Sequence, residues 1–146
     1  MDGKKVINNV MVKLFNQIMR FEEKKLITDE FHNISINDMH IIESIGLGEG
    51  KNMSTIAKEL NITVGSLTTS MNSLVKKGYV QRERSEEDRR IVYIKLTING
   101  EAAFHKHVEF HDKMTNAVCE KLTEEEMEVL VGALNKLSAF FEFEYK

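Results

Sequence analysis

The sequence from Ser54 to Val80 reads STIAKELNITVGSLTTSMNSLVKKGYV. Its first part carries apolar residues at helical spacing as far as Asn61, a residue type that interrupts helices. Thr63 then offers a hydroxyl that suits the cap of a second helix. The pattern predicts two short helices joined by a tight turn, with Ser54 capping the first. The stripe expected to be buried on the second helix consists of Val64, Leu67, Met71, Leu74 and Val75.

The rest of that second helix is rich in short polar side chains. They are Ser66, Thr68, Thr69, Ser70, Asn72 and Ser73, followed by Lys76 and Lys77. Ser, Thr and Asn are weaker helix formers than Glu and Lys, so an ordinary solvated face would not favour them. Short hydroxyl and amide groups reach base edges and phosphate oxygens in a DNA major groove. The face therefore indicates a recognition helix, against the alternative of a solvated helix in a fold that does not bind DNA.

Two runs of alternating residues follow, 80–84 and 92–96, and predict the strands of a β-hairpin. The tip between them, from Ser85 to Arg90, is polar throughout. An arginine at such a tip can enter a narrow minor groove, and we expect Arg90 to do so, with Arg89 as second choice. Asp88 is placed to orient it. The alternative is a solvated turn with an internal ion pair.

These residues carry a family resemblance. The helix pair followed by E-x-D-R-R-x-V-Y-I-x-L-T (Glu86 to Thr97) resembles the winged helix-turn-helix of MarR-family transcription regulators. Within that family the chain most resembles FabT-type repressors of fatty-acid synthesis genes. The matching segments are DMHII at 38–42, TTSMN at 68–72, KGY at 77–79 and RSEEDRR at 84–90.

The expected fold is mostly α-helical with a β-hairpin wing, in a single MarR-type domain of residues 1–146. Residues 35–97 form the DNA-binding part, while residues 5–34 and 98–146 supply dimerisation helices. Residues 1–5 are expected to fray before a helix at Val6–Leu26. Ser35 with Asp38, and Thr123 with Glu126, have the spacing of capping boxes, and Thr97 is expected to cap a long helix.

Charge and composition exclude several classes of protein. The net charge is −3, yet residues 76–95 hold seven basic and four acidic residues, a local balance of +3 that favours DNA contact there. One cysteine, no signal peptide and no membrane-length apolar run indicate a cytoplasmic protein. The glycines of Gly46–Lys51 lack phosphate-loop spacing, so this segment is expected to be a flexible connector. No acid–base or nucleophile–base pair is visible, so an enzyme is not expected.

The resemblance implies a homodimer that binds double-stranded DNA at an inverted repeat and acts as a repressor. Four basic residues are expected to touch phosphates or brace the wing: Lys76, Lys77, Arg82 and Arg84. The FabT-type resemblance further implies control by a long-chain acyl group on acyl carrier protein, acting as co-repressor, with no cofactor required. Phe15, Met19, Phe104 and Phe110 would enclose the chain, or else belong to the core.

Three other signals remain open. His107 and His111 lie four residues apart, a spacing that allows both to bind Zn²⁺ from one helix, and zinc-sensing MarR proteins resemble this chain at His40, His107 and His111. Glu22 or Glu23 would complete such a site, although residues 22–25 are otherwise expected to form a solvated patch. The favoured interpretation has no metal and packed or titrating histidines. Two further alternatives for the signal are another small molecule and a thiol switch at Cys119. An alternative for the function is a winged helix that binds protein instead of DNA.

Overall fold

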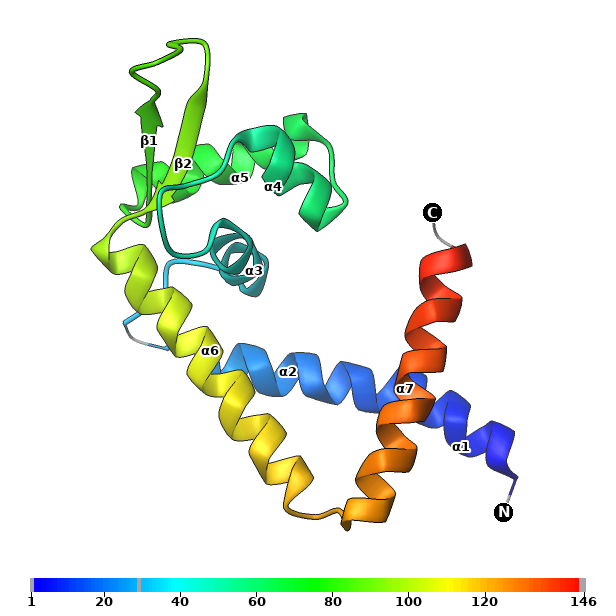
Figure 1. Cartoon of the computed structure of the whole chain (residues 1–146). Helices are drawn as coiled ribbons and strands as arrows, with labels where there is room; N and C mark the ends of the chain where they lie inside the picture. Colours follow the sequence, from blue (N-terminus) through cyan, green and yellow to red (C-terminus); the bar gives the residue numbers. More distant parts are fainter. Residues whose placement is uncertain (1, 29, 145–146) are drawn as a thin grey trace. The chain divides into compact units, whose positions relative to one another are not determined.

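The computed structural model describes residues 2–28 and 30–144. They fall into two compact units, Met1–Phe110 and His111–Lys146. In order, the elements are α1 (Gly3–Asn9), the π-helical segment η1 (Val10–Leu14), α2 (Phe15–Leu26), α3 (Ile36–Ile45), α4 (Met53–Leu60), α5 (Val64–Lys76), β1 (Val80–Arg84), β2 (Val92–Leu96), α6 (Ile98–Cys119) and α7 (Glu124–Glu144) (Figure 1). The predicted fold, mostly helical with one β-hairpin, is confirmed.

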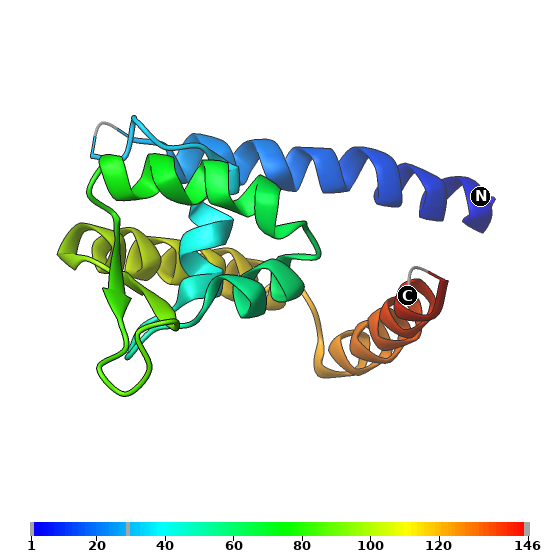
Figure 2. The same ribbon diagram turned by 90° about the horizontal axis from the view of Figure 1, so that it is seen from above.

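The first helical region runs from α1 through η1 to α2 as one long rod, drawn in blue in Figure 2. It begins at Gly3, because the Asp2 carboxylate accepts a hydrogen bond from the backbone N–H of Lys4 at 3.1 Å. The expected frayed start through Lys5 is therefore wrong. The π-helical turn at Val10–Leu14 is a local widening that the apolar periodicity did not indicate.

Helix α3 begins with the predicted capping box. Ser35 Oγ accepts from the backbone N–H of Asp38, and the Asp38 carboxylate accepts from the backbone N–H of Ser35. The helix ends at Gly46, which adopts a φ of +68°. Glycine suits that position, since a side chain would be strained there.

The turn between α4 and α5 is short. Asn61 takes the left-handed conformation and ends α4, and Thr63 Oγ1 accepts from the backbone N–H of Ser66 to begin α5. The predicted helix-turn-helix and its Thr63 cap are confirmed. The predicted Ser54 cap is wrong, because Asn52 Oδ1 accepts from the backbone N–H of Thr55 at 2.8 Å and starts α4 earlier.

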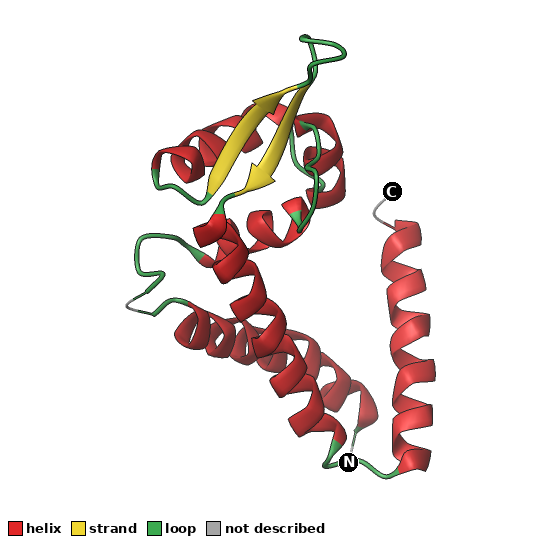
Figure 3. Ribbon diagram, turned by 60° about the vertical axis from the view of Figure 1, so that its left-hand side comes forward, coloured by secondary structure: helices red, strands yellow, loops and turns green. Residues whose placement is uncertain are grey.

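Strands β1 and β2 pair antiparallel, with Val80 opposite Leu96 at the base (Figure 3). Lys51 adds a third partner, since its backbone N–H and C=O both bond to Ile94 of β2. A Cβ at Gly50 would lie 2.7 Å from the Ile94 carbonyl oxygen, so this close approach requires glycine. The segment expected to be a flexible connector is thus fixed to the wing.

The core of the first unit gathers apolar side chains from α2, α3, the helix-turn-helix and the hairpin. Those with no exposed surface include Leu26, Met39, Ile42, Ile56, Leu67, Met71, Leu74 and Ile94. Val64 was expected in the buried stripe of α5, but its side chain is 45% exposed because it is the first residue of the helix. The predicted stripe is confirmed at Leu67, Met71 and Leu74, whereas Val75 is half-buried.

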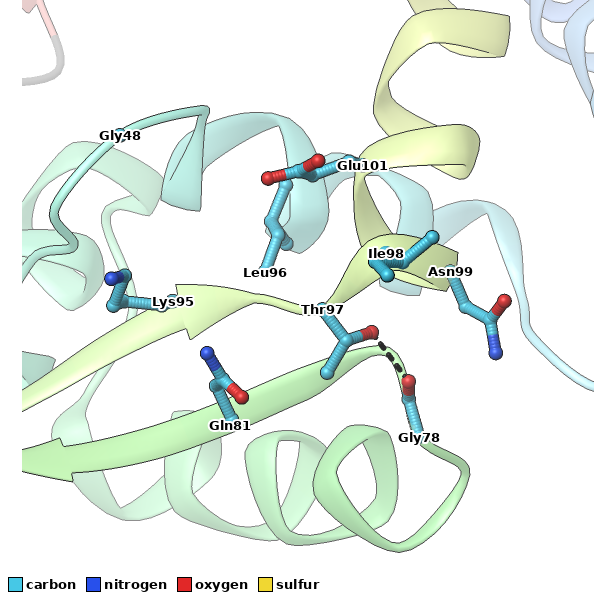
Figure 4. A pocket seen from close by; sticks show the side chains of 9 residues that line it. All are labelled: Gly48, Gly78, Gln81, Lys95, Leu96, Thr97, Ile98, Asn99 and Glu101. Carbon is cyan, nitrogen blue, oxygen red and sulfur yellow. Dashed lines mark hydrogen bonds between the residues drawn. The ribbon is translucent and has the colours of Figure 1, made fainter.

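The junction of the wing with α6 is closely packed. Thr97 Oγ1 donates to the Gly78 carbonyl and accepts from the backbone N–H of Gly100, which confirms the predicted cap (Figure 4). A Cβ on Gly100 would overlap the Tyr79 carbonyl oxygen. Only glycine lets α6 begin this close to the base of β1.

The second unit holds the end of α6 and all of α7. Thr123 and Glu126 form the predicted capping box at the start of α7. Within the described residues, α7 has no buried side chain, although it carries many apolar ones. Searched over those same residues, the chain has no helix with the length and apolar content needed to cross a membrane.

Candidate nucleic-acid interface

The outward face of α5 carries the short polar residues that the sequence singled out. Ser66, Thr68, Thr69 and Asn72 are exposed, while Ser70 is half-buried. They are exposed because Leu67, Met71 and Leu74, at three- and four-residue intervals, turn the opposite face into the core. Of the six short polar residues named on this helix, four are therefore exposed, and Ser73 is half-buried like Ser70.

Two of these side chains are already bonded to the helix. Thr68 Oγ1 donates to the Val64 carbonyl oxygen at 2.7 Å, and Thr63 Oγ1 donates to Ser66 Oγ at 3.0 Å. These local bonds hold the hydroxyls close to the backbone.

Basic residues follow this face in the chain, at the end of α5 and on β1. Lys76, Lys77, Arg82 and Arg84 are all exposed. Arg82 Nη2 donates to Asn72 Oδ1 and so links β1 to α5. The prediction that Arg82 braces the wing is consistent with this contact.

The tip of the wing holds the predicted Asp88–Arg90 pair. Arg90 Nε and Nη2 donate to the two Asp88 carboxylate oxygens at 3.1 and 3.0 Å, and the Arg90 backbone N–H also bonds to Asp88. These hydrogen bonds hold the pKa of Asp88 below its ordinary value. The Arg90 side chain is 90% exposed, and Arg89 is exposed beside it. The pair presents an oriented cation to solvent, as predicted.

The base of the wing contains an open pocket of about 730 Å³ (Figure 4). Gln81, Lys95, Thr97, Asn99 and Glu101 are among its lining residues. Lys95 also pairs with Glu83 across the hairpin, with 3.4 Å between Nζ and Oε2. None of the predicted DNA contacts is among the residues that line this pocket.

A second polar cluster lies inside the first unit, where α2, α3 and α6 meet. Glu22 Oε1 lies 3.1 Å from His40 Nε2 and 2.8 Å from His107 Nε2. Glu22 and His107 are buried, and the two imidazole rings stack with centroids 5.6 Å apart. The expectation that Glu22 belongs to a solvated patch is wrong, whereas Glu23 is exposed. Periodicity did not reveal this burial, because the partners of Glu22 are 18 and 85 residues away.

The charge state of this cluster follows from its contacts. Burial alone would raise the pKa of Glu22, but hydrogen bonds and charge from His40 and His107 outweigh it and lower the pKa below its ordinary value. Glu22 is thus held as a carboxylate between two imidazoles. Of the three histidines considered for zinc, His40 and His107 lie together in the first unit, and His111 is half-buried.

Comparisons with known proteins agree with this geometry. The model of the MarR family matches residues 34–92. The chain is 31% identical over 105 residues to the HTH-type transcriptional regulator BilQ of Clostridium symbiosum, covering 71% of this chain and 72% of BilQ. It is also 31% identical over 83 residues to YwhA of Bacillus subtilis, an HTH-type transcriptional regulator, but there it spans only 60% of the relative's length.

A solved structure shows the same likeness over the whole chain. The crystal structure of Streptococcus pneumoniae FabT in complex with DNA is similar with a TM-score of 0.90 and 38% identity, covering 95% of this chain and 97% of FabT. Relatives of this kind are regulators and not enzymes, which confirms the expectation that the chain is no enzyme. The chain therefore belongs to the MarR family of winged-helix, DNA-binding transcription regulators.

Proposed function

We propose that the chain is a homodimeric repressor of fatty-acid biosynthesis genes that uses long-chain acyl-acyl carrier protein as co-repressor. The observation that carries the proposal is the 38% identity to FabT across nearly the whole chain, with the wing and recognition helix in the same fold. The resemblance of segments 68–72 and 84–90 to FabT-type repressors supports the same assignment.

Unburied apolar surface in both units supports a dimer. In the first unit it lies on α1, η1 and the start of α2, at Val6, Ile7, Val10, Met11, Val12, Leu14 and Phe15. In the second unit it lies on α7, at Val129, Leu130, Val131, Leu134, Leu137, Phe140, Phe141 and Phe143. Apolar surface of this extent is typical of a subunit interface. A two-fold dimer predicts an inverted-repeat operator with half-site centres about 10 bp apart, or a multiple of that.

The proposed contacts divide by role. The polar face of α5 reads bases in the major groove, and Arg90 enters the adjacent minor groove, oriented by Asp88. Lys76, Lys77 and Arg84 bind phosphates, so they set affinity and salt dependence instead of sequence preference. Asp88 is the only acidic residue among the proposed contacts, and it acts through Arg90.

The acyl part of the proposal rests on the resemblance. Of the four apolar residues considered, Met19 borders a pocket of about 490 Å³ between α2 and the start of α3. Phe15 is exposed, Phe104 is half-buried, and Phe110 packs on Phe21 with ring centroids 5.4 Å apart.

The test is fluorescence anisotropy with labelled DNA from upstream of the organism's fatty-acid synthesis genes. The protein is titrated alone, with long-chain acyl-acyl carrier protein, and with unacylated carrier protein as the matched control. Tighter binding with the acylated carrier only is the expected result. Equal affinity in all three arms would contradict the acyl co-repressor.

A second candidate, regulation by Zn²⁺, is favoured by one observation. Glu22 Oε1 faces the Nε2 atoms of both His40 and His107 at 3.1 and 2.8 Å, and these are zinc-ligand atom types. Zn²⁺ would then be held by Glu22, His40 and His107, with His111 as the further residue that the resemblance suggests. Thermal melting with and without Zn²⁺ tests it, with Glu22→Met as the control variant. An increase in melting temperature for the wild type alone, together with a change in DNA affinity, would support the zinc sensor, and no change would reject it.

A further inference from the structure

Asn72 occupies a distinctive place on the recognition helix. It is exposed, and it lies one turn beyond Thr68 and Thr69 on the same face of α5. Its side-chain oxygen accepts a hydrogen bond from Arg82 Nη2 on β1. This hydrogen bond joins the hairpin to one of the predicted recognition residues of α5.

The chemistry of arginine fixes which way this amide points. A guanidinium carries five N–H donors and no acceptor, so the Asn72 atom facing it is the oxygen. The amide NH₂ group, with two donors, takes no part in this hydrogen bond. The positive charge of Arg82 stands behind it and favours acceptor atoms over amino groups in the groove.

This arrangement changes what Asn72 can read. A free asparagine binds adenine with both atoms, since its oxygen accepts from N6 and its NH₂ donates to N7. With one lone pair of the oxygen bonded to a cationic donor, the Asn72–Arg82 pair keeps two amide N–H donors and the unused guanidinium N–H groups against one remaining lone pair, so donors outnumber acceptors. Guanine presents two acceptors in the major groove, O6 and N7, whereas adenine places an amino group at position 6.

We infer that Arg82 is a positioning residue that makes Asn72 a specificity determinant for guanine over adenine in each half-site. The inference rests on the proposed DNA-binding role of α5. The alternative is that the contact only braces the wing, in which case the loss of Arg82 would weaken binding without changing base preference.

The test selects binding sites from a randomised duplex pool and sequences them for the wild type and four variants. Asn72→Ala identifies the position that Asn72 reads, as the one whose preference disappears. The wild type is expected to select guanine there, by about 5- to 10-fold over adenine. Arg82→Met is expected to shift that preference towards adenine, because it releases the Asn72 oxygen, whereas Arg82→Lys keeps a donor and retains guanine.

Arg84→Met is the matched control, because it removes an exposed arginine from the same strand and leaves the Arg82–Asn72 hydrogen bond in place. It should lower affinity and leave the base preference unchanged. Circular dichroism should show every variant folded, since Arg82, Arg84 and Asn72 are exposed.

Three results would overturn the inference. They are adenine at the Asn72-dependent position in the wild type, no position that depends on Asn72, and an Arg82→Met variant with reduced affinity but unaltered preference. Selection of a site that is absent from fatty-acid synthesis genes would count against the proposed regulon, while a guanine preference within that site would still uphold the Asn72 assignment.

Discussion

Replacing Glu22 by methionine should destabilise the protein although it leaves the DNA-binding face untouched. Glu22 is a buried carboxylate whose Oε1 bonds to His40 and His107. Methionine has a similar length and suits a helix, so the change removes the acceptor without a large cavity. His107, with a side chain only 1% exposed, then loses a hydrogen-bond partner away from water.

The magnitude follows from the difference between the two histidines. Removing the acceptor of a buried donor costs about 1–3 kcal/mol, which applies to His107. The His40 side chain is 35% exposed, so water replaces most of its bond and adds about 0.5 kcal/mol or less. The free energy of unfolding should fall by about 2 kcal/mol, and the melting temperature by about 4–8 °C. Glu22→Gln, which retains a carbonyl acceptor, should cost about half as much.

The assay is urea and thermal unfolding followed by circular dichroism, with a chelator present to exclude metal. Glu23→Met is the matched control, because that neighbour is exposed and should change stability by about 0.5 kcal/mol at most. Because the folded-state pKa of Glu22 is lowered, its contribution is present above the ordinary carboxyl pKa and is lost as the pH falls through the folded value. The gap between wild type and Glu22→Met should therefore narrow in acid. Equal stability of wild type and Glu22→Met at pH 7 would refute the reasoning.

Three further predictions concern the wing, the junction and the helix cap. Arg90→Ala should weaken operator binding about 100-fold, since two exposed wings each lose a charged contact, and should leave the melting temperature unchanged. Asp88→Ala should weaken binding less. If anisotropy titrations of Arg90→Ala match the wild type, the wing does not contact DNA. Gly100→Ala should lower stability by about 2–3 kcal/mol in urea unfolding, because its Cβ meets the Tyr79 carbonyl; wild-type stability would show that this junction relaxes freely. Thr63→Ala should cost about 1 kcal/mol in the same assay through the lost α5 cap, and no loss would mean that another group caps the helix.

Local signals in the sequence predicted most of the fold. The capping boxes at Ser35–Asp38 and Thr123–Glu126 were predicted correctly, because each depends on two residues only three positions apart. The hairpin was correct because strand alternation and a polar tip lie within 17 residues, Val80 to Leu96. The Ser54 cap was wrong because Asn52, two residues earlier, is an equally good capping type and gives α4 another half turn.

Features that depend on contacts between residues far apart in the chain could not be predicted from the sequence. Glu22 looked solvated beside Glu23 and two lysines, and only packing of α2 on α3 and α6 buries it. Gly50 looked like part of a flexible loop, and only pairing with Ile94 explains why a glycine is needed there. The Arg82–Asn72 bond was likewise hidden, because sequence spacing gives no indication of which strand arginine reaches α5.

The DNA contacts assigned to α5 and the wing remain predictions, and one titration tests them most directly. The dissociation constant for a selected inverted-repeat duplex and for a scrambled duplex would be measured between about 50 and 200 mM salt. The account predicts preference for the inverted repeat and a log–log slope of roughly −5, because Lys76, Lys77 and Arg84 would each neutralise one phosphate in each of two subunits. No binding at low salt, or equal affinity for both duplexes, would contradict it.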